Sequence, residues 1–386
     1  MSNQKRYKRN IIEKESVILA PPDMTLLVVV GFLVVIGIMA IFSASSEKSI
    51  MLGHNPASFA IKQFAFVVLG FFCMKKLART DYKKLAPWSI HLAWGVVFLL
   101  AIAAFTSMGV NTNEATRWIA IGPIQFQPSE FAKPVFALVL ASAFKYDTVI
   151  FDKDKLHYFL PLIIMLFLIF EQPNLSMILL LVSTSLVMYL CAGGNWKNIL
   201  MMCAAGIVFL SYKIRGYQMT RITTWLDPAN DPQGTGYNIL QSLYAICAGG
   251  FWGMGFGQSR QKFGWLPECH TDFIYSIIAE ELGFFGCVLI IGLFWTFIQR
   301  GITIASRCPD RFGKLLAVGL TFSIGIQALL NMSVASSFLP ATGVPLPFVS
   351  YGGTSVFTSL CMVGILLNIS RKRIKKIKNY ENQYSL

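Results

Sequence analysis

Long apolar runs recur along almost the whole chain, and they restrict the possible folds more than any other feature of the sequence. Hydrophobic residues make up 55% of the 386 residues and charged residues only 13%. The mean hydropathy is +0.57. A water-soluble fold of this size cannot hide that much apolar surface, whereas a lipid bilayer can accommodate it. The composition therefore predicts an integral membrane protein.

Ten of these runs have roughly the length that a membrane-spanning helix requires, although 131–144 is near the lower limit. A β-barrel would instead show short segments of alternating polarity, so the sequence predicts an all-α, polytopic membrane protein with about ten transmembrane helices. The first run is too long for the core of a signal peptide, so we interpret it as a membrane helix. The predicted spans are 24–42, 57–74, 88–105, 131–144, 156–170, 175–191, 198–212, 273–298, 315–332 and 353–370.

Basic residues are distributed unevenly between the two sides of this topology. With the N-terminus inside, 24 of the 33 Lys and Arg residues fall on the cytoplasmic side and seven on the other. This asymmetry predicts that both termini are cytoplasmic, and it explains the net charge of +14 without nucleic-acid binding. The predicted organisation is a cytoplasmic tail at 1–23, a membrane domain at 24–370 and a basic tail at 371–386 beside anionic lipid.

Three connections are long, and all three fall on the outer side: 106–129, 213–270 and 333–350. Long loops on a rigid helical frame usually carry function. The largest, between the seventh and eighth spans, contains an amphipathic stretch at 237–248 and a glycine run at 249–257. The run follows no strand and opens no βαβ unit, so it is not a dinucleotide fingerprint. We interpret it as a tightly turning re-entrant segment.

The segment 266–281 places ionisable side chains at the mouth of an apolar run. Such groups are costly in a bilayer and therefore mark a candidate functional site. On a helix, Asp272, Ser276 and Glu280 share one face, with Asp272 and Glu280 about 12 Å apart along the axis. The ionisable residues of the segment are Glu268, His270, Asp272, Glu280 and Glu281.

Two charges of the first outer loop have helical spacing. Glu130 and Lys133 stand three residues apart in a helix that starts at Pro128. From spacing alone, they are either a local ion pair or a functional pair, and both interpretations stay open. Trp118, upstream of them, has the type and position of an interfacial aromatic residue as well as of a ligand contact.

The remaining special residues are less specific. The segment 343–355 is rich in proline and glycine, and its irregular backbone offers N–H groups that either bind an anion or face water. The eight cysteines lack metal-ligand spacing and are predicted to be small buried hydrophobes. A disulfide between Cys247 and Cys269 stays open.

Taken together, these segments resemble the SEDS family (shape, elongation, division and sporulation) of FtsW, RodA and SpoVE. The resemblance covers most of the chain in family order, and its HTDFI and PLPFVSYGG motifs are long and specific. The stretch 257–268 is more similar to the FtsW/SpoVE branch than to RodA. The matching segments are Arg117-Trp118-Ile119, Gln127 to Glu130 with Lys133, Gln172-Pro173, Asp231-Pro232 with Gly236-Tyr237, Leu266 to Gly283, and Pro345 to Ser355.

The resemblance implies a ten-helix peptidoglycan glycosyltransferase that polymerises lipid II on the outer face of the bacterial cytoplasmic membrane. It implies a class B penicillin-binding transpeptidase and other divisome proteins as partners, at the division septum. It also assigns the family's essential aspartate to Asp272 and its important lysine and tryptophan to Lys133 and Trp118. The chain departs from the family's Gln-Pro-Asp pattern at Asn174.

The chemistry of this reaction agrees with that assignment. The donor sugar leaves a lipid diphosphate, so one carboxylate base for the acceptor hydroxyl is enough, and Asp272 is the candidate. Arg117, Lys133 or a divalent cation (Mg²⁺ or Mn²⁺) can stabilise the diphosphate. We expect Lys133 and Trp118 to line one cavity with Asp272. Further candidates for substrate binding are Glu130, Glu268, His270 and Ser350.

Other functions compete with this one. Charged residues inside helices are also typical of a lipid II flippase or a related transporter. A polymerase of the elongation type, like RodA, and a non-catalytic divisome scaffold are further alternatives. A transporter should show polar groups along its whole route, whereas the acidic cluster and the long loops here lie on one side.

Overall fold

The protein forms a bundle of apolar helices in a computed structural model that describes residues 10–106, 109–112, 115–122, 124–148, 155–201, 204 and 216–381. Nine of the ten predicted spans coincide with helices in this part of the chain, while most of 198–212 lies outside the described residues. The helices are α1 (Met24–Met51), α2 (Ser58–Arg79), α3 (Ser89–Phe105), α4 (Pro128–Ala143), α5 (Leu156–Glu171), α6 (Leu175–Cys191), α8 (Gly216–Leu226), α9 (Tyr237–Gly249), α10 (Ile274–Arg307), α11 (Arg311–Ala335) and α12 (Gly353–Ser370).

Length and composition support the membrane assignment. Within the described part of the chain, five helices are long and apolar enough to cross a membrane, and three shorter ones are apolar over 10–17 residues. The five are α1, α2, α10, α11 and α12, and the three are α3, α5 and α6. The predicted all-helical membrane class is therefore confirmed, without fixing the number of spans at ten.

Local sequence signals explain where several helices begin. The carboxylate of Asp23, just after Pro21-Pro22, accepts from Leu26 N and caps α1. Asp310 caps α11 in the same way through Gly313 N. Pro128 occupies the first turn of α4, where its missing N–H costs nothing. The same helix continues through Pro134.

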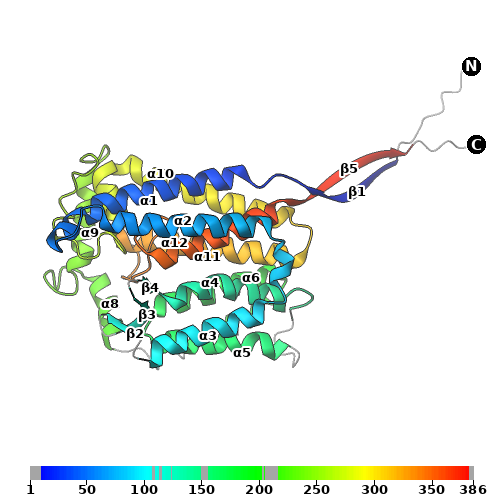
Figure 1. Cartoon of the computed structure of the whole chain (residues 1–386), viewed down its shortest axis with the longest axis horizontal. Helices are drawn as coiled ribbons and strands as arrows, with labels where there is room; N and C mark the ends of the chain where they lie inside the picture. The colour runs from blue at the N-terminus through cyan, green and yellow to red at the C-terminus, as the bar shows by residue number, and fades with distance from the viewer. Residues whose placement is uncertain are drawn as a thin grey trace, which may run out of the picture.

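The helices form two groups that lie side by side in Figure 1. One group contains α1, α2 and α10 to α12, with α2 packed on α12 and α10 on α11. The other contains α3 to α6, and α4 and α6 pack against α11. Helices α11 and α12 are consequently the most buried of the long spans, while α2 faces largely outward.

Two small antiparallel sheets add to the predicted helices. The tails pair as β1 (Asn10–Leu19) and β5 (Lys372–Glu381), with Asn10 opposite Glu381 and Leu19 opposite Lys372. The first outer loop forms a sheet of β2 (Gly109–Thr112), β3 (Ala115–Ile121) and β4 (Ile124–Phe126). The sequence analysis did not predict either sheet.

The long loops and the two tails lie at opposite ends of the bundle (Figure 1). The sheet β2–β4, the helices α8 and α9 and the start of α12 lie at one end, and β1 and β5 project from the other. This arrangement agrees with the predicted grouping of 106–129, 213–270 and 333–350 on one side. We call it the outer end, and the opposite end the tail end.

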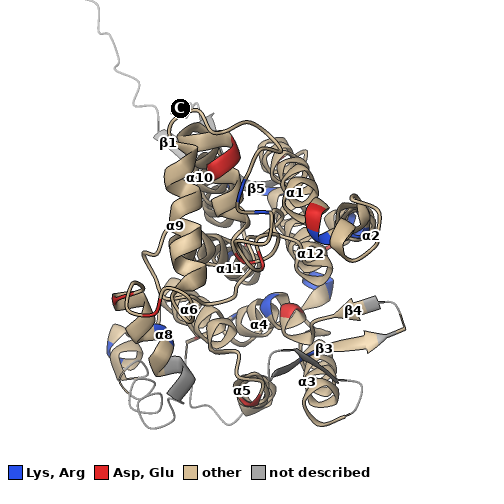
Figure 2. Ribbon diagram, turned by 90° about the vertical axis from the view of Figure 1, so that its left-hand side faces the viewer, with Lys and Arg blue, Asp and Glu red and all other residues tan. Residues whose placement is uncertain are grey.

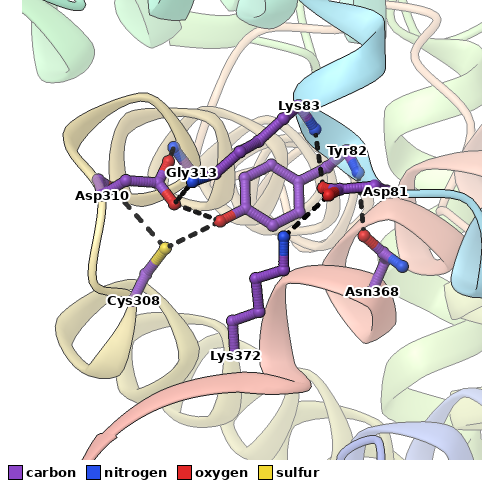
Figure 3. Close-up of polar contacts among 8 residues, drawn as sticks. All are labelled: Asp81, Tyr82, Lys83, Cys308, Asp310, Gly313, Asn368 and Lys372. Carbon is purple, nitrogen blue, oxygen red and sulfur yellow. Dashed lines mark hydrogen bonds and ion pairs between the residues drawn. The ribbon is translucent and has the colours of Figure 1, made fainter. Parts of the chain in front are cut away.

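At the tail end, a polar clasp joins two connections between helices to the end of α12 and the start of β5 (Figure 3). Tyr82, in the short 3₁₀ turn Tyr82–Leu85, donates its hydroxyl to Asp310 before α11. Its backbone N–H donates to Asn368 Oδ1 at 2.9 Å, and Asn368 Nδ2 donates to Ala78 O at 2.9 Å. Lys372 at the start of β5 pairs with Asp81 at 2.8 Å. The clasp fixes the tail hairpin to the bundle.

Helix α10 is broken at Gly283, two residues after Glu281, and the glycine run 249–257 packs against the break. Gly283 has φ +64° and ψ −159°, outside helical geometry. The freed carbonyls of Glu280 and Glu281 accept from Met254 N at 2.9 Å and Gly255 N at 3.0 Å. The predicted tightly turning segment is therefore a backbone patch that satisfies an interrupted helix.

Candidate active site

A cavity of about 380 Å³ opens at the outer end, and Asp272 is the one carboxylate among the described residues that line it. Its wall combines α8, α9, the segment before α10, the end of α11 and the segment 341–344. Apolar side chains alternate with hydroxyl, amide and guanidinium groups. The polar lining residues besides Asp272 are Thr220, Arg221, Thr224, Thr235 and Asn238.

The charges around Asp272 determine its protonation. Burial raises the pKa of Asp272 to about 6, and the negative charge of Glu268 adds to this, whereas Arg221 and Arg117 oppose it. Asp272 is therefore mostly ionised near pH 7 while remaining a better base than an exposed carboxylate. Figure 2, which looks onto this end of the molecule, shows blue and red residues close together at α4 and near α8.

Hydrogen bonds from the Ser350 hydroxyl and from the backbone hold the segment before α10 against the loop before α12. Ser350 Oγ donates to Thr271 O at 2.6 Å and accepts from Leu346 N at 2.8 Å. Tyr351 N donates to His270 O at 2.9 Å. Ser350, a candidate for substrate binding, is thus used to join the two family motifs and does not line the cavity.

Two amides of α11 contact the same region, and the sequence analysis missed both. Asn331 Nδ2 donates to Asp272 O and to Val344 O, each at 2.8 Å. Gln327 Nε2 donates to Pro345 O at 2.8 Å. The signal was present, since the two amides lie four residues apart in an apolar span and so share one helix face.

Lys133 is sealed inside the bundle. Its Nζ lies 2.5 Å from Glu130 Oε2 and donates to Gln327 Oε1 at 2.6 Å, and the side chain has no exposed surface. The local ion pair that the spacing allowed is therefore present. Neither Lys133 nor Trp118, half-buried on β3, lines the cavity at Asp272, so the predicted shared cavity is wrong. The reason is that a buried ammonium is stable only beside its carboxylate.

Arg117 is anchored on the turn before α6. Its Nε donates to Gln172 O at 3.0 Å and its Nη2 to Pro173 O at 2.6 Å. Asn174, the departure from the family pattern, accepts from Met177 N at 3.3 Å as the cap of α6. An asparagine caps a helix as well as an aspartate does, so the change keeps the helix start.

Arg221 on α8 is a cavity residue that the sequence analysis counted only as a loop charge. Its Nη1 donates to Ala341 O at 3.1 Å, which ties α8 to the segment 341–344. Arg221 lines the same cavity as Asp272, and its positive charge lowers the pKa of the Asp272 carboxyl. Basic residues in long loops say little about membrane topology. The sequence analysis therefore did not select Arg221 as a candidate site residue.

Glu268 and His270 lie beside the cavity without lining it. Glu268 is exposed and pairs with Lys48 of α1 at 3.6 Å. His270 is buried against the rings of Phe59 and Tyr351, with centroids 5.2 and 5.8 Å away. Burial lowers the pKa of His270 to about 4, so the ring is neutral at pH 7.

The two deeper glutamates of α10 are engaged in packing. Glu280 accepts from Ser259 Oγ at 2.5 Å and from Arg260 N at 3.0 Å. Glu281 accepts from Ser43 Oγ of α1. Both carboxylates therefore hold other segments against the break in α10, which agrees with the structural role expected for Glu280.

Among the described residues, the side chains around the cavity do not form a site for a resident metal ion. In the part of the chain that the structure describes, no three His, Cys, Asp or Glu residues come together in a metal-binding group, and the cavity offers the single carboxylate of Asp272. Cys247 is free and exposed, and Cys269 is free and buried, so the possible disulfide is not formed.

Comparison with known sequences gives one consistent family. Residues 24–375 match the family model FTSW_RODA_SPOVE, described as "Cell cycle protein". The "Probable peptidoglycan glycosyltransferase FtsW" of Trichlorobacter lovleyi is 38% identical over 361 residues, covering 91% of this chain and 94% of that protein. The "Stage V sporulation protein E" of Bacillus subtilis is 38% identical over 355 residues, covering 91% and 97%.

Solved structures show the same fold. A chain from "Structural coordination of polymerization and crosslinking by a peptidoglycan synthase complex" has a TM-score of 0.74 and 27% identity, covering 91% of this chain and 98% of its own length. The rod shape determining protein RodA of Thermus thermophilus has a TM-score of 0.67 and 26% identity, covering 91% and 97%.

Proposed function

This chain belongs to the FtsW/RodA/SpoVE family of cell cycle proteins, and from that premise we propose that it is a peptidoglycan glycosyltransferase that polymerises lipid II during cell division. The observation that carries this proposal is the outer-end cavity, which Asp272 and Arg221 line together with hydroxyl and amide side chains. A lipid-linked substrate keeps its prenyl chain in the bilayer, so its reacting sugar is presented at the end of a helix bundle.

Asp272 acts as the general base of the proposed reaction. The acceptor hydroxyl oxygen attacks the anomeric carbon of the donor sugar, its proton passes to the Asp272 carboxylate, and the carbon–oxygen bond to the lipid diphosphate breaks. With a pKa of about 6, Asp272 combines a large ionised fraction near pH 7 with useful basicity. No second carboxylate is needed, because the diphosphate leaves without protonation.

Two arginines stabilise the leaving diphosphate. Arg221 lines the cavity, and Arg117 is close enough to lower the pKa of Asp272. Guanidinium groups match phosphate oxygens in geometry and charge, and they stabilise the charge that develops as the bond breaks. Lys133 is assigned instead to the packing of α4 against α11, because its charge is already paired. A divalent cation, if used, enters as the counter-ion of the diphosphate.

Sequence similarity favours the division branch over the elongation branch. The relatives named FtsW and stage V sporulation protein E reach 38% identity, whereas the RodA structure shares 26%. The flippase alternative loses support, since the charged residues buried inside α4 and α10 are paired or hydrogen-bonded within the bundle. A scaffold role gives no reason for the Asp272 cavity.

Membership of this family supports a proposal for the partner and the location. The peptidoglycan synthase complex named above couples polymerisation to crosslinking, so we assign this chain a class B penicillin-binding transpeptidase as its partner, with other divisome proteins. The chain is a multi-pass membrane protein. We place it in the cytoplasmic membrane at the septum, with both tails and the tail end of the bundle inside.

A reconstitution assay tests the function directly. The purified protein in liposomes, with and without a class B transpeptidase, receives fluorescent lipid II, and glycan length is read on gels. We expect polymer from the wild type and none from Asp272→Asn. Movement of labelled lipid II across the bilayer without polymer would indicate a flippase. If the complex with the transpeptidase showed neither movement nor polymer, the scaffold function would be favoured.

A further inference from the structure

Asn331 of α11 forms hydrogen bonds to two segments that line the cavity, the one that carries Asp272 and the one that contains Val344. Its Nδ2 donates to the carbonyl of Asp272 and to the carbonyl of Val344, each at 2.8 Å. The side chain is 1% exposed. One amide therefore joins the segment that carries the base to the segment that forms the facing wall, although the two are far apart in the sequence.

The facing wall lies close to the carboxylate itself. A β-carbon added to Gly343, whose φ is +65°, would lie 3.4 Å from Asp272 Oδ2. Any outward movement of the segment 343–344 would open this side of the carboxylate to water. Asn331 prevents that movement by holding the carbonyl next to Gly343.

A second amide of the same helix face extends the connection. Gln327, one turn before Asn331, donates to Pro345 O and accepts from the buried ammonium of Lys133. The ion pair of Lys133 with Glu130 is thereby linked through Gln327 to the segment that Asn331 holds. This link gives Lys133 a connection to the site even though it does not line the cavity.

We propose that Asn331 is a positioning residue for the glycosyl transfer, which sets the location and the dryness of the Asp272 carboxylate by holding both cavity walls, with Gln327 supporting it from the Lys133 ion pair. This inference rests on the function proposed above. Asn331 touches the backbone of the base and of the wall rather than the reacting atoms. A displacement of about 1 Å at a catalytic group costs roughly 10²-fold in rate.

The pH–rate profile separates this role from simple support of the fold. Without Asn331, the side of the carboxylate that the segment 343–344 covers becomes open to water, and we expect the pKa of Asp272 to fall from about 6 toward its ordinary value. Glu268, Arg221 and Arg117, the charged groups that act on Asp272, stay unchanged in the variant. In the pH–rate profile, the rise of the polymerisation rate on the acid side (the acid limb) should therefore move to lower pH, and kcat should fall.

The experiment uses the full-length protein with lipid II in liposomes. Asn331→Leu keeps the side-chain volume and removes both N–H donors. Asn331→Ser, a smaller polar replacement, is the second variant and is used if Asn331→Leu does not fold. Asn368→Ala is the matched control, because Asn368 is also a buried amide that joins two backbone groups, at the tail end (Figure 3). Rates are normalised to folded protein.

We expect an approximately 10²-fold lower kcat and an acid limb at lower pH for the Asn331 variants, with an unshifted limb for Asn368→Ala. The inference is overturned if the folded Asn331 variants keep the wild-type limb, whatever their kcat, or if the control shifts equally. Failure of the proposed function is distinguishable, since the wild-type protein itself would then form no polymer.

Discussion

At the scale of single residues, the candidate site depends on the contrast between one ionised carboxylate and several charges that are already neutralised. Asp272 faces a cavity with Arg221, whereas Lys133 and Glu280 are paired or hydrogen-bonded inside the bundle. Buried charges without partners are unstable, so the paired groups stabilise packing, and Asp272, at the cavity, is available to substrate. Three predictions follow from this contrast.

Replacing Asp272 by asparagine should abolish polymerisation. The amide keeps the shape but cannot accept the hydroxyl proton, and general-base contributions are roughly 10²–10⁴-fold. Expression and binding of the transpeptidase should be retained. Glu268→Gln is the control, because Glu268 is exposed and lies outside the cavity. A wild-type rate for Asp272→Asn, with a loss for Glu268→Gln, would transfer the base to Glu268.

The rate should depend on pH through a single carboxylate. A pKa of about 6 means that the base is ionised above pH 6 and protonated below it, so activity rises through pH 6 and then levels. At pH 5 we expect about a tenfold lower rate than at pH 8, measured with unchanged protein in liposomes. An acid limb centred near pH 4 would show that burial does not raise the pKa of this carboxylate.

Neutralising Arg221 should weaken use of the donor. The Arg221→Gln variant loses a charge-assisted contact to the diphosphate, and we expect kcat/KM to fall by roughly 10- to 100-fold. Initial rates across a range of lipid II concentrations measure it. Arg260→Gln is the matched control for Arg221→Gln, since Arg260 belongs to the same outer loop but does not line the cavity. Equal losses for both variants would point to a general charge effect.

At the scale of elements, α10 and the glycine run form one unit. The run supplies N–H groups to carbonyls that the break at Gly283 leaves free. Its backbone approaches so closely that a β-carbon on Gly253 would lie 2.1 Å from Glu281 O. Glycine is required there by proximity as well as by conformation, which explains why a dinucleotide-like pattern occurs in a membrane protein.

Gly253→Ala should consequently destabilise the fold. The clash with the Glu281 carbonyl adds to the strain of φ +78°, and together we expect a loss of a few kcal/mol in the free energy of unfolding. Thermal unfolding in detergent measures it. Gly257→Ala is the matched control, with φ +77° and open space around the added carbon. A cost no larger than that of the control would exclude close packing as the reason for Gly253.

At the scale of the whole molecule, the bundle separates chemistry from anchoring. The cavity and the long loops lie at the outer end, and the clasp around Tyr82 with the paired tails lies at the other (Figures 1 and 3). In the sequence, basic residues concentrate on the side of the two tails, so the positive-inside rule predicts that the cavity faces the outside of the membrane.

Cysteine labelling should verify this orientation. In a protein lacking its eight native cysteines, Asn230→Cys in the outer loop should react with an impermeant maleimide on intact inner membranes. Lys84→Cys, near the clasp, should react only after the membrane is permeabilised. Both positions are exposed, so access depends on the side of the membrane. The reverse pattern would invert the topology.

The sequence by itself determined the membrane class, the position of nine helices, the family and the candidate carboxylate. Apolar runs, caps such as Asp23 and contiguous motifs are local properties, and each can be read from neighbouring residues. The separate tails, loops and membrane domain, and the catalytic role of Asp272, stay predictions.

Only the tertiary structure decided which polar groups meet. Asn331 reaches Asp272 across 59 positions, and Lys133 reaches Gln327 across 194. The sequence therefore placed Lys133 in the cavity and missed Arg221, because the spacing along one helix does not specify which neighbouring helix faces it. A buried charge is satisfied by whatever partner the packing brings near, and that packing is a property of the whole bundle.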